Sequence, residues 1–266
     1  MRIAAGIEYD GTAYNGWQKV ETGTGVQAVV ERALGRVANH EIEVTCAGRT
    51  DAGVHATAQV VHFDTESDRA MRSWLLGANS NLPDDVCVTW VKPVADDFHA
   101  RYAATARTYR YLILNRLVRS ALHRKRAWWV HETLAAEAMH EAGQLLLGEH
   151  DFSAFRAAGC QARTPMRNVT SLEVSRHGDW LRLTVSANAF LQHMVRNITG
   201  VLVAIGRGEQ PVGWATDVLD GRDRTLGGVA APPHGLTLIG VDYPEAFGIP
   251  TAAMPSLVPG INDVSD

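Results

Sequence analysis

The chain has 266 residues, of which 46% are hydrophobic and 20% are charged, and its formal net charge is −4. This length and hydrophobic content suffice for one large domain or two ordinary ones, which excludes a disordered chain and a small disulfide-stapled scaffold. The longest apolar runs fall far short of the ~20 residues that a membrane-spanning helix needs, so we expect no membrane segment. Because Met1 leads directly into a strand-like stretch without an apolar signal region, we expect a cytoplasmic protein.

The three cysteines are Cys46, Cys87 and Cys160. Their odd number and wide spacing fit reduced, buried thiols better than a disulfide framework or a zinc site. We therefore expect neither a disulfide nor a metal ion.

The charge is distributed unevenly along the chain. Residues 1–97 carry a net charge of −6, residues 98–208 carry +8, and residues 209–266 carry −6. Acidic residues are absent from 98–131, 152–172 and 180–208, and arginine outnumbers lysine 22 to 3. Guanidinium groups suit bidentate contacts with phosphates and stacking on bases. The acid-free segments favour a binding face for a polyanion over an ordinary solvated surface, a choice that arginine richness alone leaves open.

The first part of the chain contains short segments with strand-like alternation and two segments with apolar residues at helical spacing. In chain order the pattern predicts a strand at 2–9, a helix at 26–37, strands at 41–46 and 58–63, a helix at 67–76 and a strand at 86–91. This order is β-α-β-β-α-β.

The second part of the chain repeats the same order. The pattern predicts a strand at 108–114, a helix at 134–147, a hairpin of strands at 169–175 and 181–187, an apolar helix at 190–205, a shorter helix at 211–219 and a strand at 235–242. The hairpin turns at His177, Gly178 and Asp179.

Two successive β-α-β-β-α-β sets predict an α+β protein with two ferredoxin-like domains, whose antiparallel sheets meet at a central basic cleft. We place the first domain at 1–104 and the second at 105–246. Residues 247–266 contain three prolines and no periodicity, so we expect a flexible tail there.

The densest cluster of turn and polar residues lies at 46–56, between two predicted strands. Gly48 and Gly53 allow backbone angles and close approaches that a side chain would block, and Arg49 and Asp51 stand between them. On spacing alone, a loop that holds Asp51 for chemistry and a salt-bridged hairpin loop fit equally well.

The stretch GRTDAGVHA at 48–56 resembles the signature of the tRNA pseudouridine synthase A family, in which the aspartate is the catalytic nucleophile. The resemblance extends over roughly residues 2–244. The other stretches that resemble family motifs, in the family's order, are YDGT at 9–12, YNGWQ at 14–18, FHAR at 98–101, RTYRY at 107–111, DF at 151–152, RTP at 163–165, HMVRNI at 193–198 and GL at 235–236.

This resemblance implies cofactor-free isomerisation of uridine to pseudouridine at nucleotides 38, 39 and 40 of the tRNA anticodon stem-loop, by a homodimer that grips one tRNA with both subunits. It implies Asp51 as the nucleophile and Arg196 as the partner of its carboxylate. Tyr109 would stack on the flipped-out uracil and is a candidate acceptor of the C5 proton. Arg49 would fill the vacated space or hold a flanking phosphate, and Leu236 would close the other face of the pocket.

The residues themselves leave other roles open at several of these positions. Arg196 also fits a structural helix arginine, Tyr109 a core strand residue and Leu236 ordinary core. The resemblance does not decide whether the aspartate attacks C1′ of the sugar or C6 of the base. From the charge pattern we add Arg110 and Arg124 as expected tRNA contacts.

Three other function classes can be compared with the sequence. GTGVQA at 23–28 fits a phosphate-binding G-x-G-x-x-[GA] loop, with Glu43 at the spacing of a ribose contact, but no predicted strand ends at Gly23. The H-x-E and P-C-x-x-C signatures of zinc nucleobase deaminases are absent from the sequence. A non-catalytic RNA-binding protein is the remaining alternative, although RNA binding alone has no need of a carboxylate facing a polyanion.

Overall fold

The computed structural model describes residues 1–20 and 22–251. It has mixed α+β structure, as the sequence predicts, and divides into two compact units. The first unit comprises Met1–Thr105 and the segment from Leu238 onward, and the second comprises Ala106–Thr237. Most of the expected tail, residues 252–266, lies outside the described residues.

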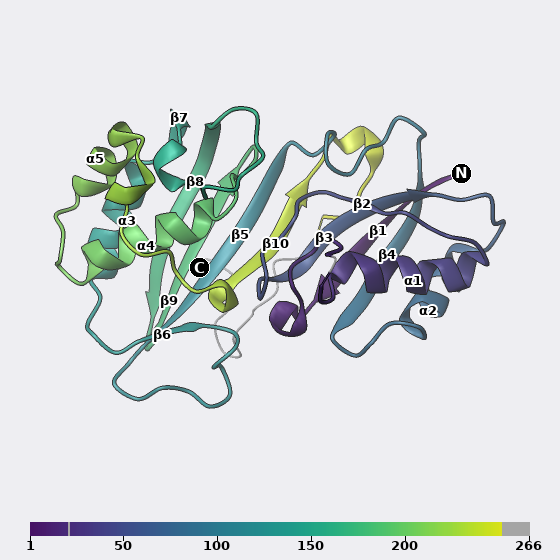
Figure 1. The fold of residues 1–266 in the computed structure, drawn as a ribbon, viewed down its shortest axis with the longest axis horizontal. Helices are drawn as coiled ribbons and strands as arrows, with labels where there is room; N and C mark the ends of the chain where they lie inside the picture. Colours follow the sequence, from purple (N-terminus) through teal and green to yellow (C-terminus); the bar gives the residue numbers. More distant parts are fainter. Residues whose placement is uncertain (21, 252–266) are drawn as a thin grey trace. The chain divides into compact units, whose positions relative to one another are not determined.

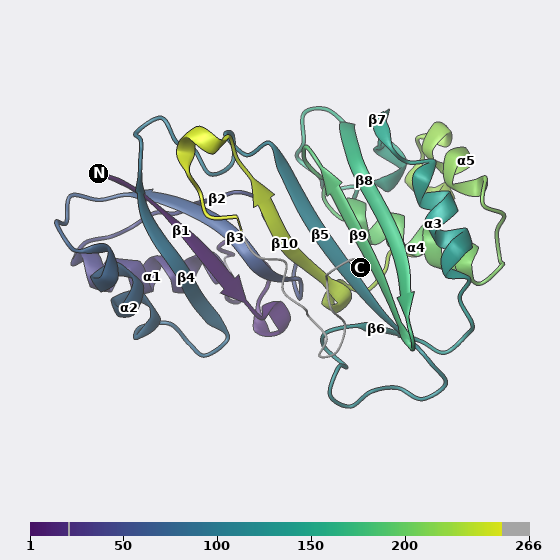
Figure 2. The ribbon, with the colours of Figure 1, turned by 180° about the vertical axis from the view of Figure 1, so that it is seen from behind.

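The first unit contains an antiparallel sheet with β1 between two longer neighbours. Residues of β1 such as Ile3 and Ile7 are fully buried, and Ile3 pairs with Phe63 of the next strand. Two helices cover one face of this sheet (Figures 1 and 2), where Trp74 packs against Phe63 with ring centroids 5.3 Å apart. The elements are β1 (Arg2–Tyr9), α1 (Val26–Ala38), β2 (Thr45–Cys46), β3 (His55–Asp64), α2 (Met71–Asn79) and β4 (Val86–Val94), with β1 paired to β3 and β4, and β2 paired to β3.

The strand predicted at 41–46 is mostly absent from the sheet, because only the two residues of β2 form a ladder. The alternation that predicted the strand is real, since Ile42 and Val44 are buried while Glu41 and Glu43 are exposed. Side chains replace strand partners here: Val44 donates its N–H to the Glu31 carboxylate and accepts from the Gln27 amide.

The second unit also contains an antiparallel sheet with helices against one face (Figures 1 and 2). The hairpin of β8 and β9 turns at Gly178, whose φ of +59° suits glycine. Helix α4 is buried over its whole length except at Arg196 and Ala204, which explains its almost continuous apolar sequence. The elements are β5 (Ala106–Asn115), β6 (Trp128–Val130), α3 (Ala136–Gln144), β7 (Gly148–Asp151), β8 (Met166–His177), β9 (Trp180–Ala187), α4 (Met194–Gly206) and α5 (Trp214–Gly221), with the sheet order β5-β9-β8-β7 and β6 parallel to β5.

Strands β6 and β7 were not predicted, because each is short and is defined by its partner rather than by its own alternation. Helix α1 starts at Val26 as predicted, whereas the other four helices start later than predicted, at Met71, Ala136, Met194 and Trp214. Short 3₁₀ turns complete the chain: η1 (Gly11–Ala13), η2 (Ser153–Phe155), η3 (Arg224–Leu226), η4 (Pro233–Gly235) and η5 (Glu245–Phe247).

The chain passes from the second unit back to the first within β10 (Leu236–Asp242). The expected second domain extended to residue 246, but the segment from Leu238 onward packs with the first unit. Aromatic contacts explain why this segment packs with the first unit, because the ring centroid of Phe98 lies 5.2 Å from those of both Tyr243 and Phe247. The backbone adds a hydrogen bond of 2.8 Å from the Thr105 N–H to the Asp242 carbonyl.

All three cysteines are free, but the expectation that all are buried is wrong. Cys46 is buried, Cys160 is half-buried, and Cys87 is exposed because it points outward on β4 between the buried Val86 and Val88. Within the part of the chain that the structure describes, every helix falls short of the length and apolar character that a membrane span requires.

Candidate active site

The loop that carries Asp51 leaves β2 and runs alongside β3 before it turns. Ala47 donates its N–H to the Val60 carbonyl at 2.8 Å, so the chain continues next to β3 after the last ladder pair. The fully buried Gln59 side chain then binds the backbone of Gly48, donating to its carbonyl at 2.7 Å. The loop is therefore fixed to the sheet up to the residue before Arg49.

A tight turn places Asp51 at the point where the chain reverses into β3. Val54 donates its N–H to the Asp51 carbonyl at 3.1 Å, and Gly53 has a φ of +78°. A positive φ at the third position is what a type II turn requires, which explains the glycine. Asp51 is half-buried and Arg49 is exposed.

The segment at 9–17 holds this loop from the other side. The Tyr9 hydroxyl and the Thr50 hydroxyl share a buried hydrogen bond of 2.8 Å. Trp17 donates its N–H to the Thr50 carbonyl at 3.0 Å, and Gly53 donates to the Tyr14 carbonyl at 3.3 Å. The residues before and after Asp51 are therefore both tied to one neighbouring segment, which limits the movement of the carboxylate.

Two glycines of that segment let the backbones approach closely. A Cβ at Gly16 would lie 2.7 Å from the Thr50 carbonyl oxygen and 3.1 Å from the Asp51 carbonyl carbon, and Gly16 also has a φ of +93°. A Cβ at Gly11 would lie 2.0 Å from the Val54 carbonyl oxygen. Any side chain at either position would push the loop outward.

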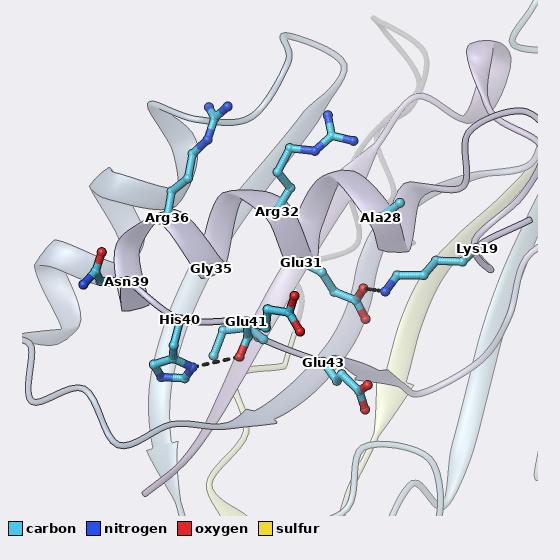
Figure 3. A pocket seen from close by; sticks show the side chains of 11 residues that line it. Lys19, Ala28, Glu31, Arg32, Gly35, Arg36, Asn39, His40, Glu41 and Glu43 are labelled. Carbon is cyan, nitrogen blue, oxygen red and sulfur yellow. Dashed lines mark hydrogen bonds and ion pairs between the residues drawn. The ribbon is translucent and has the colours of Figure 1, made fainter.

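Figure 3 shows side chains of α1 together with Lys19 before the helix and Glu43 after it. Glu31 is only 5% exposed, and its carboxylate accepts from Val44 N–H at 3.0 Å and from the Gln27 amide at 2.9 Å. Lys19, two residues after Trp17, forms an ion pair with the same carboxylate. Glu31 and Lys19 border a groove of about 590 Å³ whose lining includes none of the predicted site residues.

Two guanidinium groups lie near the buried thiol at the start of the loop. Burial raises the pKa of Cys46 to about 11, and the positive charges of Arg49 and Arg101 act against that rise. Both arginines therefore lie near the start of the Asp51 loop. A carboxylate on a fixed loop with cations nearby can serve as a nucleophile or a base.

Tyr109 lies on β5 of the second unit and is 7% exposed. Its ring meets Phe190 edge to face, with centroids 5.2 Å apart, and its backbone pairs with Val185. Tyr111 lies two residues further along the strand, so its side chain points to the same face.

Arg196 and Leu236 are brought together around Tyr111. Arg196 donates from Nε to the Ala231 carbonyl at 2.8 Å, and the Tyr111 hydroxyl donates to the Pro232 carbonyl at 2.7 Å. Burial raises the pKa of Tyr111 well above its usual value, and the nearby Arg196 charge opposes that rise. Gly235 packs directly on the Tyr111 ring, and the buried Leu236 follows it.

The two expected phosphate contacts differ in exposure. Arg110 is only 3% exposed and points to the face of β5 opposite Tyr109, and its contact with tRNA stays a prediction. Arg124 is exposed in the loop between β5 and β6, where Nη1 donates to the Ala121 carbonyl at 2.9 Å. This loop borders a hollow of about 170 Å³ that His123 and Trp129 also line.

Sequence reasoning missed the supporting role of Tyr9, Gly16 and Thr50. All three lie within stretches that resemble family motifs, which is the signal that could have found them. The hydrogen-bonded hydroxyls of Tyr9 and Thr50 are 41 positions apart in the sequence, and no local sequence pattern encodes such a pair.

Comparison with known proteins extends over most of the chain. The sequence model of a family described as tRNA pseudouridine synthase matches residues 5–103 and 142–244. A tRNA pseudouridine synthase A of Aeromonas hydrophila is 57% identical over 250 residues, which cover 94% of this chain and 93% of that protein. Proteins of the same name from Nitrosococcus oceani and Legionella pneumophila are 55% identical over 258 residues and 54% identical over 250 residues. The first alignment covers the whole Nitrosococcus protein and 97% of this chain. The second covers 95% of the Legionella protein and 94% of this chain.

Proposed function

The chain belongs to the tRNA pseudouridine synthase family, which is an isomerase family. From that premise we propose that it converts uridine to pseudouridine at nucleotides 38, 39 and 40 of the tRNA anticodon stem-loop. We propose Asp51 as the nucleophile. The observation that carries this proposal is the loop at 47–54, whose backbone is fixed on both sides of a half-buried carboxylate. A loop that served only RNA binding would not need its one carboxylate to be held so firmly.

The reaction breaks the bond between N1 of uracil and C1′ of ribose and forms a bond between C5 and C1′. The uracil turns between the two steps, N1 gains a proton and C5 loses one, so no atom is added to the nucleotide overall. Asp51 attacks either C1′ or C6 and holds one part of the nucleotide while the base turns, and this bond breaks again, freeing the carboxylate, before the product leaves. Since the reaction needs neither an oxidant nor a group donor, we propose that it proceeds without a cofactor.

The target base must leave the helical stack before attack, at an unstacking cost of a few kcal/mol. Arg49, which is exposed and two residues from the nucleophile, would fill the vacated space or hold the flanking phosphate. A guanidinium suits either task because it is planar and donates several hydrogen bonds.

The second unit supplies the remaining proposed roles. Tyr109 stacks on the uracil and is the candidate acceptor of the C5 proton, and Leu236 closes the other face of the base pocket. Arg196 pairs with the nucleophile's carboxylate. The hydrogen bond from Arg196 to Ala231 and the packing of Gly235 on Tyr111 support these roles, because they hold the arginine and the last strand near β5.

The proposal also includes the larger assembly. We propose two ferredoxin-like domains, because each unit has an antiparallel sheet with helices on one face. We further propose that their sheets meet at a basic cleft, that the chain acts as a homodimer that grips one tRNA with both subunits, and that it acts in the cytoplasm, where tRNA is modified.

The position of the product tests the substrate assignment. An unmodified tRNA transcript with uridine at 38, 39 and 40 is incubated with the protein, and pseudouridine is mapped by carbodiimide adducts that stop reverse transcriptase. We expect stops that mark nucleotides 38 to 40 only. Pseudouridine at other positions alone would refute the anticodon assignment, and its complete absence would refute the proposed reaction.

A further inference from the structure

We propose that Tyr102 is a stacking platform for an RNA base other than the one that is isomerised, an inference that rests on the proposed function. The Tyr102 side chain is 77% exposed, although it belongs to a turn whose neighbours Phe98 and Ala100 are fully buried. A tyrosine ring presented to water in this way has apolar surface available to a partner.

The turn that presents Tyr102 is anchored on several sides. Arg2 donates from Nη1 to the Phe98 carbonyl at 2.9 Å, and the Tyr243 hydroxyl donates to the Ala100 carbonyl at 2.6 Å. Ala100 in turn donates its N–H to Nδ1 of the buried His62 at 3.1 Å. The backbone below the ring is therefore held by β1, by β3 and by the segment after β10.

The ring itself is held by His99 and Arg101. The Tyr102 and His99 ring centroids are 4.3 Å apart, and the Arg101 guanidinium lies 5.7 Å from the Tyr102 centroid. The backbone N–H groups of Arg101 and Tyr102 both donate to Nδ1 of His99, at 3.1 and 3.2 Å. Because these contacts leave most of the ring exposed, a flat partner can bind without first ordering the side chain.

The charge around Tyr102 favours RNA over a protein partner. Arg101, next to Tyr102, and Arg49 both lie near Cys46. The carboxylates of Asp64, Asp96 and Asp97 close to the turn act on Arg2, and Asp64 forms an ion pair with it. Exposed aromatic rings beside guanidinium groups are the usual means of stacking unpaired bases while binding their phosphates. The turn is also tied to the strands that lead into the Asp51 loop, because Ala100 donates to His62, and His62 pairs with Thr45, the residue before Cys46.

Affinity measurements on three variants test this proposal with the same unmodified tRNA transcript. We expect Tyr102→Ala to weaken binding about 5- to 100-fold, the range found for removing one base–aromatic stack. Tyr102→Phe keeps the ring and should bind within about twofold of the wild type. The slope of log Kd against log salt should not change in either variant, because tyrosine carries no charge to be exchanged for counterions.

The matched control is Leu76→Ala, which removes another exposed apolar side chain of the same unit, on α2. It should leave the affinity unchanged. A second readout is the emission of Tyr102→Trp minus that of the wild type, which stacking on a base should quench. Both readouts require only binding, so they stand apart from the proposed reaction.

Wild-type affinity in Tyr102→Ala would overturn the proposal, as would unquenched emission in Tyr102→Trp. A change of oligomeric state in Tyr102→Ala, with unchanged tRNA affinity, would overturn it in favour of a protein contact. Pseudouridine formation by the wild type is measured in parallel. If the wild type forms pseudouridine and Tyr102→Ala binds tRNA with the wild-type Kd, the stacking platform is refuted and the proposed function is not.

Discussion

Gly16→Ala tests the inference that the segment at 9–17 positions the nucleophile. The new methyl group would lie 2.7 Å from the Thr50 carbonyl oxygen, whereas ordinary contact begins at 3.4 Å, so the loop must retreat by about 0.7 Å. The φ of +93° adds backbone strain of about 1–3 kcal/mol. A displacement of about 1 Å at a reacting group costs roughly 100-fold in rate. We therefore expect the single-turnover rate to fall about 10- to 100-fold.

The assay is release of tritium from C5 of labelled uridine in tRNA, with enzyme in excess so that only the chemical step is followed. The Kd for tRNA should stay within about threefold of the wild type, because binding draws on many contacts outside the loop. Gly178→Ala is the matched control: it places alanine at a φ of +59° with no atom within 4 Å of the new Cβ. It should cost about 1 kcal/mol of stability and leave the rate unchanged. A folded Gly16→Ala protein with a wild-type rate would refute the positioning role.

Three further variants follow from the site and its surroundings. Tyr109→Phe should retain the Kd for tRNA and lower the single-turnover rate at least tenfold if the hydroxyl accepts the C5 proton, whereas an unchanged rate would confine Tyr109 to stacking. Arg124→Glu should weaken tRNA binding and reduce the salt slope by about one or two charges, and an unaltered slope would place this arginine outside the interface. Burial lowers the pKa of His62 to about 4. The contribution of the neutral ring to the free energy of unfolding is therefore complete above about pH 6.5, the usual pKa of histidine, and is lost as the pH falls towards 4. Urea unfolding at pH 4.5 and 7.5 should therefore show about 2 kcal/mol more acid destabilisation for the wild type than for His62→Gln, and equal losses would contradict this.

Strong local periodicity is what made much of the fold predictable. Helix α1 buries Val26, Val30, Leu34 and Val37 along one face, and its predicted and observed bounds differ by one residue. By contrast, β6 and β7 take their strand character from pairing partners. Their short sequences carry no alternation that could have revealed them.

The candidate site was predictable only where family motifs supplied roles. Asp51 and Arg49 stood out because glycines flank them, and Gly53 indeed adopts a positive φ. The burial of Arg110 was not predictable from composition, because a charge count does not say that both faces of β5 are covered. The Tyr9 and Thr50 contact depends on tertiary packing, so it required the structure.

The central claim is that Asp51 is the nucleophile, and the most direct measurement is tritium release by Asp51→Asn beside its affinity for the same labelled tRNA. The amide has nearly the size of the carboxylate but cannot attack as an anion. We predict that the wild type releases tritium, and that Asp51→Asn releases none while it binds tRNA with a Kd within about threefold of the wild type. Tritium release by Asp51→Asn at a rate near that of the wild type would contradict the account.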